Sequence, residues 1–243
     1  MDKGFVIMAQ NTNKVDYVKC AQILKKSILS VMPESNVTII TELPYGDLAP
    51  DSDWKLINDW QVYEASPYEY TIKLEADMII PSNIDYYWEV LKDRDLVVSS
   101  NIRNYKNQIS DVKFYRQFIV DNKLPDVYNA ITYWRLSKTA KDFFDLVKNI
   151  FEQWESYRTL LKFPDEVPTT DVVYAIAAMI LGPEEVTLPK GLGPTIVHMK
   201  RYINPIQTDD WTKELVWETN PFRINTVAQF GLVHYHIKEW RSE

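Results

Sequence analysis

The sequence predicts an α/β fold with a mixed, mostly parallel sheet flanked by helices. An apolar strand at Gly4–Ala9 is followed by a helical pattern over Val15–Val31 and by a β-branched strand at Val37–Thr41. A strand, a helix and a strand in this order open a parallel sheet, because the helix carries the chain back across one face. Two further apolar strands, at Tyr70–Leu74 and Leu96–Ser99, extend the same pattern.

The first helix shows the spacing most clearly. Apolar residues recur every three or four positions, at Val18, Ala21, Leu24 and Ile28, and Pro33 ends the pattern. The strands on either side of it are short apolar runs of the kind found in a buried sheet.

The strand at Tyr70–Leu74 is interrupted by two acids and resumes at Met78–Ile80. A helix should follow, with Ser82 as its N-cap and Asp85 in the capping-box position. The same periodicities predict the remaining elements: a helix at Asp51–Ala65, a helix at Ser110–Asn122, a strand at Val127–Arg135, a long helix at Lys138–Leu161, a helix at Thr169–Leu181, short strands at Glu185–Leu188, Thr195–Met199, Phe222–Asn225 and Phe230–His236, and a helix around Asp209–Trp217.

Composition sets the class of protein. The chain has 243 residues, of which 46% are apolar, and no linker or repeat divides it, so we expect one domain over residues 1–243. The single cysteine, Cys20, excludes an intramolecular disulfide and a cysteine zinc site. No stretch approaches the ~20 apolar residues of a membrane span. We therefore expect no membrane partner and a cytoplasmic location.

Charge is unevenly placed along the chain. The net charge of −7 argues against a general nucleic-acid binder, which needs many cations facing phosphates. The stretch Asn101–Lys123 carries an excess of basic residues, of which Arg103 is the first. It is either a local basic surface or an ordinary solvated loop and helix face.

Glu75-Ala76-Asp77 is the most informative motif. Residues i and i+2 of a strand face the same side, so both carboxylates should project together at a strand end. Two like charges in a buried place repel each other unless a cation neutralises them, and a hard divalent ion with oxygen ligands would do so. The alternative is that Glu75 is solvated and Asp77 caps a turn.

The three histidines, His198, His234 and His236, all lie in strand-like segments near the end of the sequence. His234 and His236 should share one face of their strand, where two imidazoles can bind a metal. Each histidine could instead be a hydrogen-bonded structural residue.

Asp171 lies at the start of the apolar helix at Thr169–Leu181. An acid in the first turn of a helix interacts favourably with the helix dipole. Asp165 and Glu166 are the alternative acids in this region.

The order of these elements, with an acidic D-x-D-like motif at a strand end near residue 75, resembles the nucleotide-sugar glycosyltransferases of the GT-A fold. Glu75 departs from that motif, which has aspartate in the first position. The fuller context, IKLEADMIIPSNIDYYWEVLKDRD and DVYNAITYWRLSKTAKDFF, resembles glycosyltransferases encoded by tailed bacteriophages. Some of those are thought to modify hydroxymethylated bases in phage DNA.

This resemblance implies roles for the candidate residues. Asp77, with Glu75 and one or more of His198, His234 and His236, would hold Mn²⁺ or Mg²⁺ against the diphosphate of a UDP-sugar. Residues 1–100 would form the nucleotide-sugar and metal half, and residues 101–243 the acceptor half with C-terminal metal and phosphate contacts. The implied donor-binding residues are Ala9, Gln10, Asn11, Asn13, Tyr17, Lys200 and Lys238.

On the acceptor side, the resemblance implies Asn129, Tyr133, Trp134 and Arg103, with Asp171 near the acceptor hydroxyl. Tyr133 and Trp134 would stack on a sugar or base, or else pack in the core. The implied acceptor is a 5-hydroxymethylated pyrimidine in DNA, such as 5-hydroxymethylcytosine, or a sugar already attached to it. Host cytoplasm would be the location of a phage-encoded enzyme.

Other classes fit less well. A glycan or small-molecule acceptor is a competing expectation and suits the acidity of the chain better. A nucleotidyltransferase of similar fold would usually carry a glycine-rich phosphate loop after its first strand, and residues 10–14 contain no glycine. A non-catalytic sugar- or nucleic-acid-binding module would explain the aromatic residues but not the paired acids. No P-loop or G-x-S-x-G sequence is present.

Overall fold

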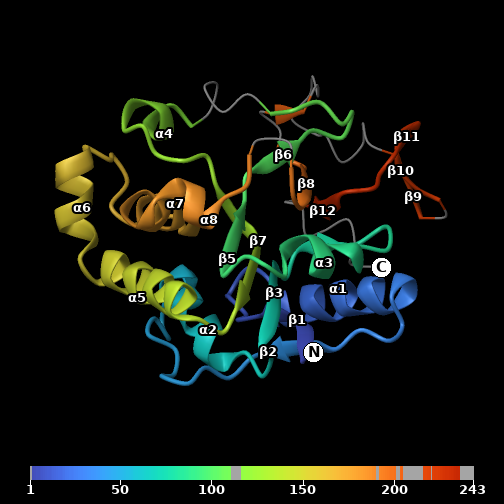
Figure 1. The fold of residues 1–243 in the computed structure, drawn as a ribbon, viewed down its shortest axis with the longest axis horizontal. Coiled ribbons are helices and arrows are strands. Elements are labelled where there is room, and N and C mark those ends of the chain that lie inside the picture. The colour runs from blue at the N-terminus through green and yellow to red at the C-terminus, as the bar shows by residue number, and fades with distance from the viewer. Residues whose placement is uncertain are drawn as a thin grey trace.

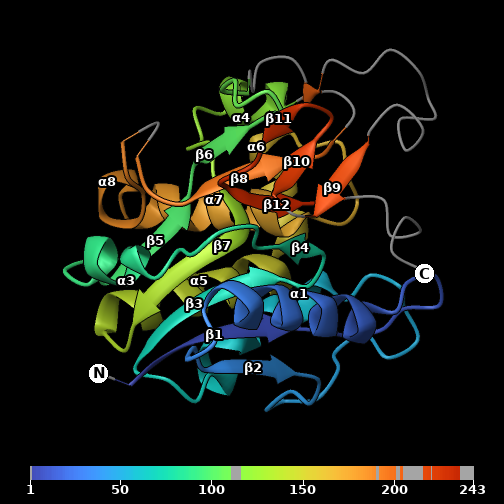
Figure 2. The same ribbon diagram turned by 90° about the vertical axis from the view of Figure 1, so that its right-hand side faces the viewer.

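A computed structural model describes residues 2–110, 116–189, 192–200, 203–204, 216–219 and 221–235. Figures 1 and 2 show the arrangement of its elements. Along the chain these are β1 (Lys3–Met8), α1 (Tyr17–Val31), β2 (Val37–Ile40), the 3₁₀ helix η1 (Leu56–Gln61), α2 (Val62–Ala65), β3 (Tyr70–Glu75), β4 (Met78–Ile79), α3 (Tyr86–Leu91), β5 (Leu96–Ser99), β6 (Asn101–Arg103), α4 (Gln117–Asp121), β7 (Tyr128–Arg135), α5 (Lys138–Glu152), α6 (Trp154–Leu161), α7 (Thr170–Leu181), α8 (Pro183–Val186), β8 (Thr195–His198), β9 (Trp217–Thr219), β10 (Phe222–Ile224), β11 (Val227–Ala228) and β12 (Leu232–His234).

The central sheet has five strands in the order β2-β1-β3-β7-β5. β1 pairs in parallel with β2 and β3, whereas β7 is antiparallel to both β3 and β5. The sheet is therefore mixed and mostly parallel, and the fold class predicted from the sequence is confirmed.

Side chains alternate between two cores on the faces of this sheet. Phe5 and Ile7 of β1 pack with α1 and α3 on one face, and Val6 packs with α5 and α7 on the other. Figure 2 shows α1 in front of the sheet and α5 and α7 behind it. The period of two is what a strand covered by helices on both faces requires.

A second sheet lies beside the central one, in the order β4-β12-β8-β6. β12 pairs in parallel with β8 and antiparallel with β4, so the strand that follows β3 directly in sequence belongs to this second sheet. A three-stranded antiparallel sheet of β9, β10 and β11 adjoins a small core around Ile224 and Val233.

Two predicted helices differ from the structure. Ser82 is not an N-cap: its Oγ donates to the Phe230 carbonyl oxygen at 3.0 Å, and α3 begins only at Tyr86. The helix expected at 51–65 is shorter, because η1 and α2 occupy only Leu56–Ala65.

The segment from 138 to 161 forms two helices, α5 and α6, which meet at Gln153. The strand predicted at Glu185–Leu188 is wrong, since α8 covers Pro183–Val186. Proline at the first helical position and two glutamates in the first turn favour a helix there.

Two predictions fall partly outside the described residues. Of the helix expected at Ser110–Asn122, the structure describes α4 at Gln117–Asp121, and residues 111–115 are not described. Most of the helix expected around Asp209–Trp217 is likewise not described, and Trp217 begins β9. None of the helices in the described part of the chain is long and apolar enough to cross a membrane.

Candidate functional site

A cavity of about 390 Å³ lies where the ends of β1 and β3 meet β8 and β12. Antiparallel β7 contributes its first residues to the same edge, because its start lies beside the end of β3. The cavity is lined by Met8, Gln10, Thr12, Tyr17, Asp53, Trp54, Lys55, Leu56, Asp59, Lys73, Glu75, Ala76, Asp77, Tyr128, Asn129, Ala130, Thr170, Asp171, His198, Lys200 and His234.

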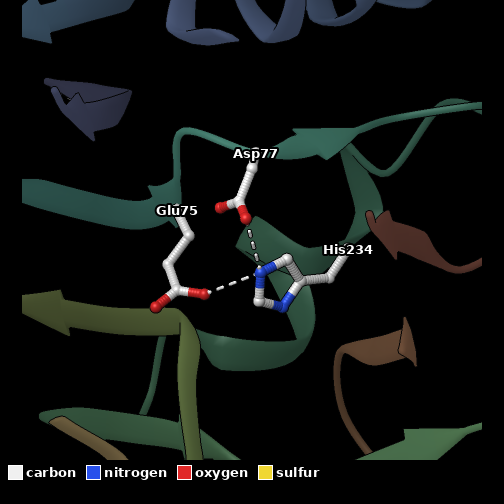
Figure 3. Close-up of side chains that lie close together, drawn as sticks. All are labelled: Glu75, Asp77 and His234. Atoms are coloured by element: carbon white, nitrogen blue, oxygen red, sulfur yellow. Dashed lines mark ion pairs between the residues drawn. The ribbon is translucent and has the colours of Figure 1, made fainter. Parts of the chain in front are cut away.

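Glu75, Asp77 and His234 converge on one point of this cavity. The Nε2 atom of His234 lies 3.2 Å from an oxygen of Glu75 and 3.2 Å from an oxygen of Asp77. Figure 3 shows both carboxylates directed at the same ring nitrogen. The ligand atoms of the three side chains all lie within 4.8 Å of one another.

Backbone pairing holds this cluster in place. β4 follows the acidic motif at once and pairs with β12, so that Met78 lies opposite His234. The backbone N–H of Tyr235 donates to the Asp77 carbonyl oxygen at 3.0 Å, which fixes the acid beside the histidine strand. Glu75 ends β3 in the central sheet. The cluster therefore joins the two sheets.

The cluster suits a divalent cation. Burial raises the pKa of Glu75, His234 lowers it and the charge of Asp77 raises it, and the net effect is a raised pKa. A bound cation would relieve the repulsion between the two acids. Carboxylates suit hard divalent ions and an imidazole suits transition metals, so the three side chains together could hold a divalent metal ion. Among the residues described, no other group of His, Cys, Asp and Glu side chains gathers in this way.

A column of tilted and edge-on ring contacts leads to His234. The His198 ring centroid lies 4.9 Å from that of His234, and the Tyr128 ring lies 5.6 Å from that of His198. The Arg116 guanidinium stacks 4.2 Å above the Tyr128 ring. Arg116 is buried and bonds to Asp126 at 3.0 Å.

Burial alone would lower the pKa of Arg116, but the negative charges of Asp171 and Asp126 are among the effects that raise it. The guanidinium is therefore a fixed positive charge at one end of the column.

A circuit of hydrogen bonds, completed by the backbone of α7, runs through residues that line the cavity. Lys73 Nζ lies 2.6 Å from Asp59 Oδ1, and the Tyr174 hydroxyl donates to Asp59 Oδ2 at 2.5 Å. Lys73 also donates to the Asn129 carbonyl oxygen at 3.5 Å, and the Asn129 N–H donates to Asp171 Oδ1 at 2.9 Å. Asp171 and Tyr174 lie three residues apart on α7, which closes the circuit.

Burial raises the pKa of Tyr174 well above its usual value, and Asp59 raises it further, so the phenol stays a donor. Sequence analysis missed Asp59, Lys73 and Tyr174. The available signal was a lysine within the apolar strand that leads to Glu75.

Comparison with protein-family models and with curated proteins finds no match for this sequence. Two solved structures resemble it over nearly the whole chain. An active-site mutant of LgtC is 13% identical, with a TM-score of 0.55, over 96% of this chain and 87% of LgtC. The apo form of mouse xyloside xylosyltransferase 1 is 10% identical, with a TM-score of 0.53, over 97% of this chain and 98% of its own.

This chain has a GT-A-type fold. The resemblance stated from the sequence is thereby confirmed at the level of fold.

The GT-A-type fold brings most of the predicted metal and donor residues to the cavity. Gln10, Tyr17, His198 and Lys200 line it together with the three cluster residues. The Gln10 side chain accepts from Asn58 at 2.9 Å, which orients its amide.

Three other donor candidates have structural roles and do not line the cavity. Ala9 is buried and continues the pairing of β1, because its N–H donates to the Ile40 carbonyl oxygen. Asn11 accepts from the Val18 N–H at 2.9 Å, and the Asn13 N–H donates to Asp53 at 2.7 Å. His236 and Lys238 lie outside the described residues.

On the acceptor side, Asn129 and Asp171 line the cavity. Of the two alternatives for Tyr133 and Trp134, the structure shows core packing and not a ligand contact, because both side chains are fully buried, one on each face of the sheet. Arg103 lies in β6, away from the described cavity lining, and donates to the Asn107 carbonyl oxygen at 3.0 Å.

The basic stretch 101–123 is not a uniform surface. Arg116 is buried in the column described above, and residues 111–115 are outside the described part of the chain.

Proposed function

We propose that this protein is a metal-dependent glycosyltransferase that uses a nucleoside-diphosphate sugar, with UDP as the nucleotide. One observation carries the proposal: Glu75, Asp77 and His234 form a compact cluster at the edge of a cavity in a GT-A-type fold. The two most informative structural neighbours are both glycosyltransferases.

In this proposal Asp77, Glu75 and His234 hold the divalent ion. The ion, when bound, neutralises the charge that develops on the departing diphosphate. Lys200, which also lines the cavity, supplies a second positive charge toward the phosphates. Gln10 and Tyr17 stand on the donor side, where Tyr17 would pack against the nucleoside.

Asp171 is the proposed contact for the acceptor hydroxyl. Its Oδ1 atom accepts the Asn129 N–H, and this bond orients the carboxylate at the cavity. The other oxygen, Oδ2, is then the atom that would accept a proton from the attacking hydroxyl group.

For the acceptor we propose a 5-hydroxymethylated pyrimidine in DNA, following the sequence resemblance to phage glycosyltransferases. A base in duplex DNA would have to be flipped out to reach the cavity. A glycan acceptor is the competing class, favoured by the likeness to a xyloside xylosyltransferase. Acceptor binding that weakens steeply with salt would support DNA, because only a polyanion releases counterions. The expected cytoplasmic location belongs to the same proposal.

The test measures release of nucleotide and transfer of sugar from a panel of UDP- and GDP-sugars with Mn²⁺. Reactions are run with and without DNA containing 5-hydroxymethylcytosine, on the wild type and on Asp77→Ala. Asp165→Asn is the matched control, since Asp165, an alternative to Asp171 in the sequence, is an exposed acid on a loop and does not line the cavity. Metal-dependent release that Asp77→Ala abolishes and Asp165→Asn retains supports the proposal. No release from any donor, with no binding of UDP and Mn²⁺, would refute it.

A further inference from the structure

Lys73 and Asp59 of the hydrogen-bond circuit are not among the proposed metal ligands or nucleotide contacts. Lys73 and Asp59 both line the cavity, yet their side chains are only 2% and 7% exposed. They form a buried ion pair at the base of an open site.

A buried ion pair of this kind is not explained by a gain in folding stability alone. Removing two charges from water costs about as much as their attraction returns, and well-packed apolar residues of similar volume often stabilise a protein as well or better. A buried ion pair that lines an open cavity is instead well placed to meet a bound ligand.

The position of the pair indicates which part of a ligand it meets. Lys73 and Glu75 lie on the same face of β3, two residues and therefore about 6.6 Å apart along the strand. The sugar of a nucleotide sugar is bonded directly to the phosphate that the metal holds. The pair thus lies about one sugar ring from the metal cluster.

The chemistry of the circuit suits neutral hydroxyl groups. Each oxygen of Asp59 accepts one bond within the circuit and has a further lone pair, while Lys73 has a third N–H beyond those directed at Asp59 and Asn129. Sugar hydroxyls both donate and accept. The Lys73–Asp59 pair is neutral overall, and Asp171 beside it is acidic, so a phosphate group is disfavoured there.

We propose that Asp59 and Lys73 bind the hydroxyl groups of the transferred sugar and so determine which sugar is used. Tyr174 and Asn129 are positioning residues. The Tyr174 hydroxyl donates to Asp59, and the Asn129 carbonyl oxygen accepts from Lys73. This inference rests on the proposed function.

The test uses the full chain with both charges removed, as Asp59→Asn with Lys73→Gln, which keeps the shape of the pair without leaving an unpaired buried charge. Asp145→Asn with Lys141→Gln makes the same changes in a solvent-exposed pair of α5, where the atoms are 2.8 Å apart. Two quantities are measured for each: binding of UDP with Mn²⁺, and the ratio of kcat/KM between UDP-glucose and UDP-galactose.

We expect the Asp59/Lys73 variant to bind UDP with Mn²⁺ within about threefold of the wild type, because the metal cluster is intact. Its discrimination between the two sugars should fall by about tenfold or more, as expected when hydrogen bonds to a substrate hydroxyl are lost. The Asp145/Lys141 variant should match the wild type in both. Tyr174→Phe, which removes one hydroxyl, should lower discrimination by a smaller factor in the same direction.

An unchanged sugar ratio in the Asp59/Lys73 variant, with UDP binding retained, would overturn this inference and leave the proposed function intact. If the wild type binds no UDP with Mn²⁺ and uses no nucleotide sugar, the proposed function itself fails, and this inference fails with it. If the Asp59/Lys73 variant does not fold, an unchanged sugar ratio in Tyr174→Phe overturns the inference.

Discussion

Asp77→Asn should abolish the stabilisation of the folded protein by Mn²⁺. In the metal-free protein, the two acids of the cluster have ligand atoms within 4.8 Å. At 4.8 Å and an effective dielectric constant of about 20, their repulsion is about 3.5 kcal/mol before any offset from His234, which contacts both acids. Neutralising Asp77 removes this repulsion, so the metal-free variant should be at least as stable as the metal-free wild type.

In the presence of metal, we expect the wild type to be more stable than Asp77→Asn. A cation present at about 100 times its Kd stabilises the folded wild type by about 2.7 kcal/mol. For a chain of this size that corresponds to a rise in Tm of about 5–10 °C. Asp77→Asn loses one of the charged ligands and should show little or none of this rise.

The assay is thermal unfolding followed by circular dichroism, with Mn²⁺ titrated against EDTA. Asp165→Asn is again the matched control and should respond as the wild type does. An equal rise in Tm for Asp77→Asn and the wild type would show that Mn²⁺ binds elsewhere, and would refute the assignment of the cluster as a metal site.

Three further outcomes follow from the geometry. Arg116→Met should weaken Mn²⁺ binding by about tenfold or more, because the column of ring contacts through Tyr128 loses the guanidinium at its end. Loss of outer-shell support commonly has an effect of this size. Equal affinity by calorimetry would contradict this. Trp134→Ala should cost about 3–5 kcal/mol of unfolding free energy in urea, since the side chain is fully buried, and a loss under 1 kcal/mol would count against its place in the core. Arg135 lowers the pKa of Asp95, so their pairing contributes stability above the unfolded pKa of about 3.9 and loses it as the pH falls through the folded value. The difference in urea midpoint between wild type and Asp95→Asn should therefore shrink from pH 6 to pH 3, and a constant difference would exclude the ion pair as its cause.

Local patterns were enough to predict the start of the fold. The periodicities that predict the strand, helix and strand over residues 3–40 depend only on residues close together in the sequence. The paired acids were also recognisable, because charges that interrupt an apolar strand have few structural explanations. The histidine that joins the two acids could not be predicted from such a local pattern. Choosing His234 depends on the pairing of β12 with β4, which joins distant parts of the chain.

The errors have similar physical causes. Trp134 lies in a strand whose two faces are both covered by helices, so alternation along the strand does not show which aromatic residues reach a ligand. Lys73 was not predicted because its partner Asp59, and Tyr174, which donates to Asp59, come from separate elements. Long-range contacts of this kind leave little trace in the local sequence.

Because β4 pairs with β12, the two acids meet His234 only late in synthesis of the protein. The acids are translated in the first third of the chain, whereas the imidazole follows only in its last described strand. Chains fold from the N-terminus as they emerge from the ribosome, so the central sheet can form while the third ligand is still untranslated. In the proposed enzyme, capture of the cation therefore requires that β12 has been translated and paired with β4, and a product truncated before β12 carries the central sheet without His234.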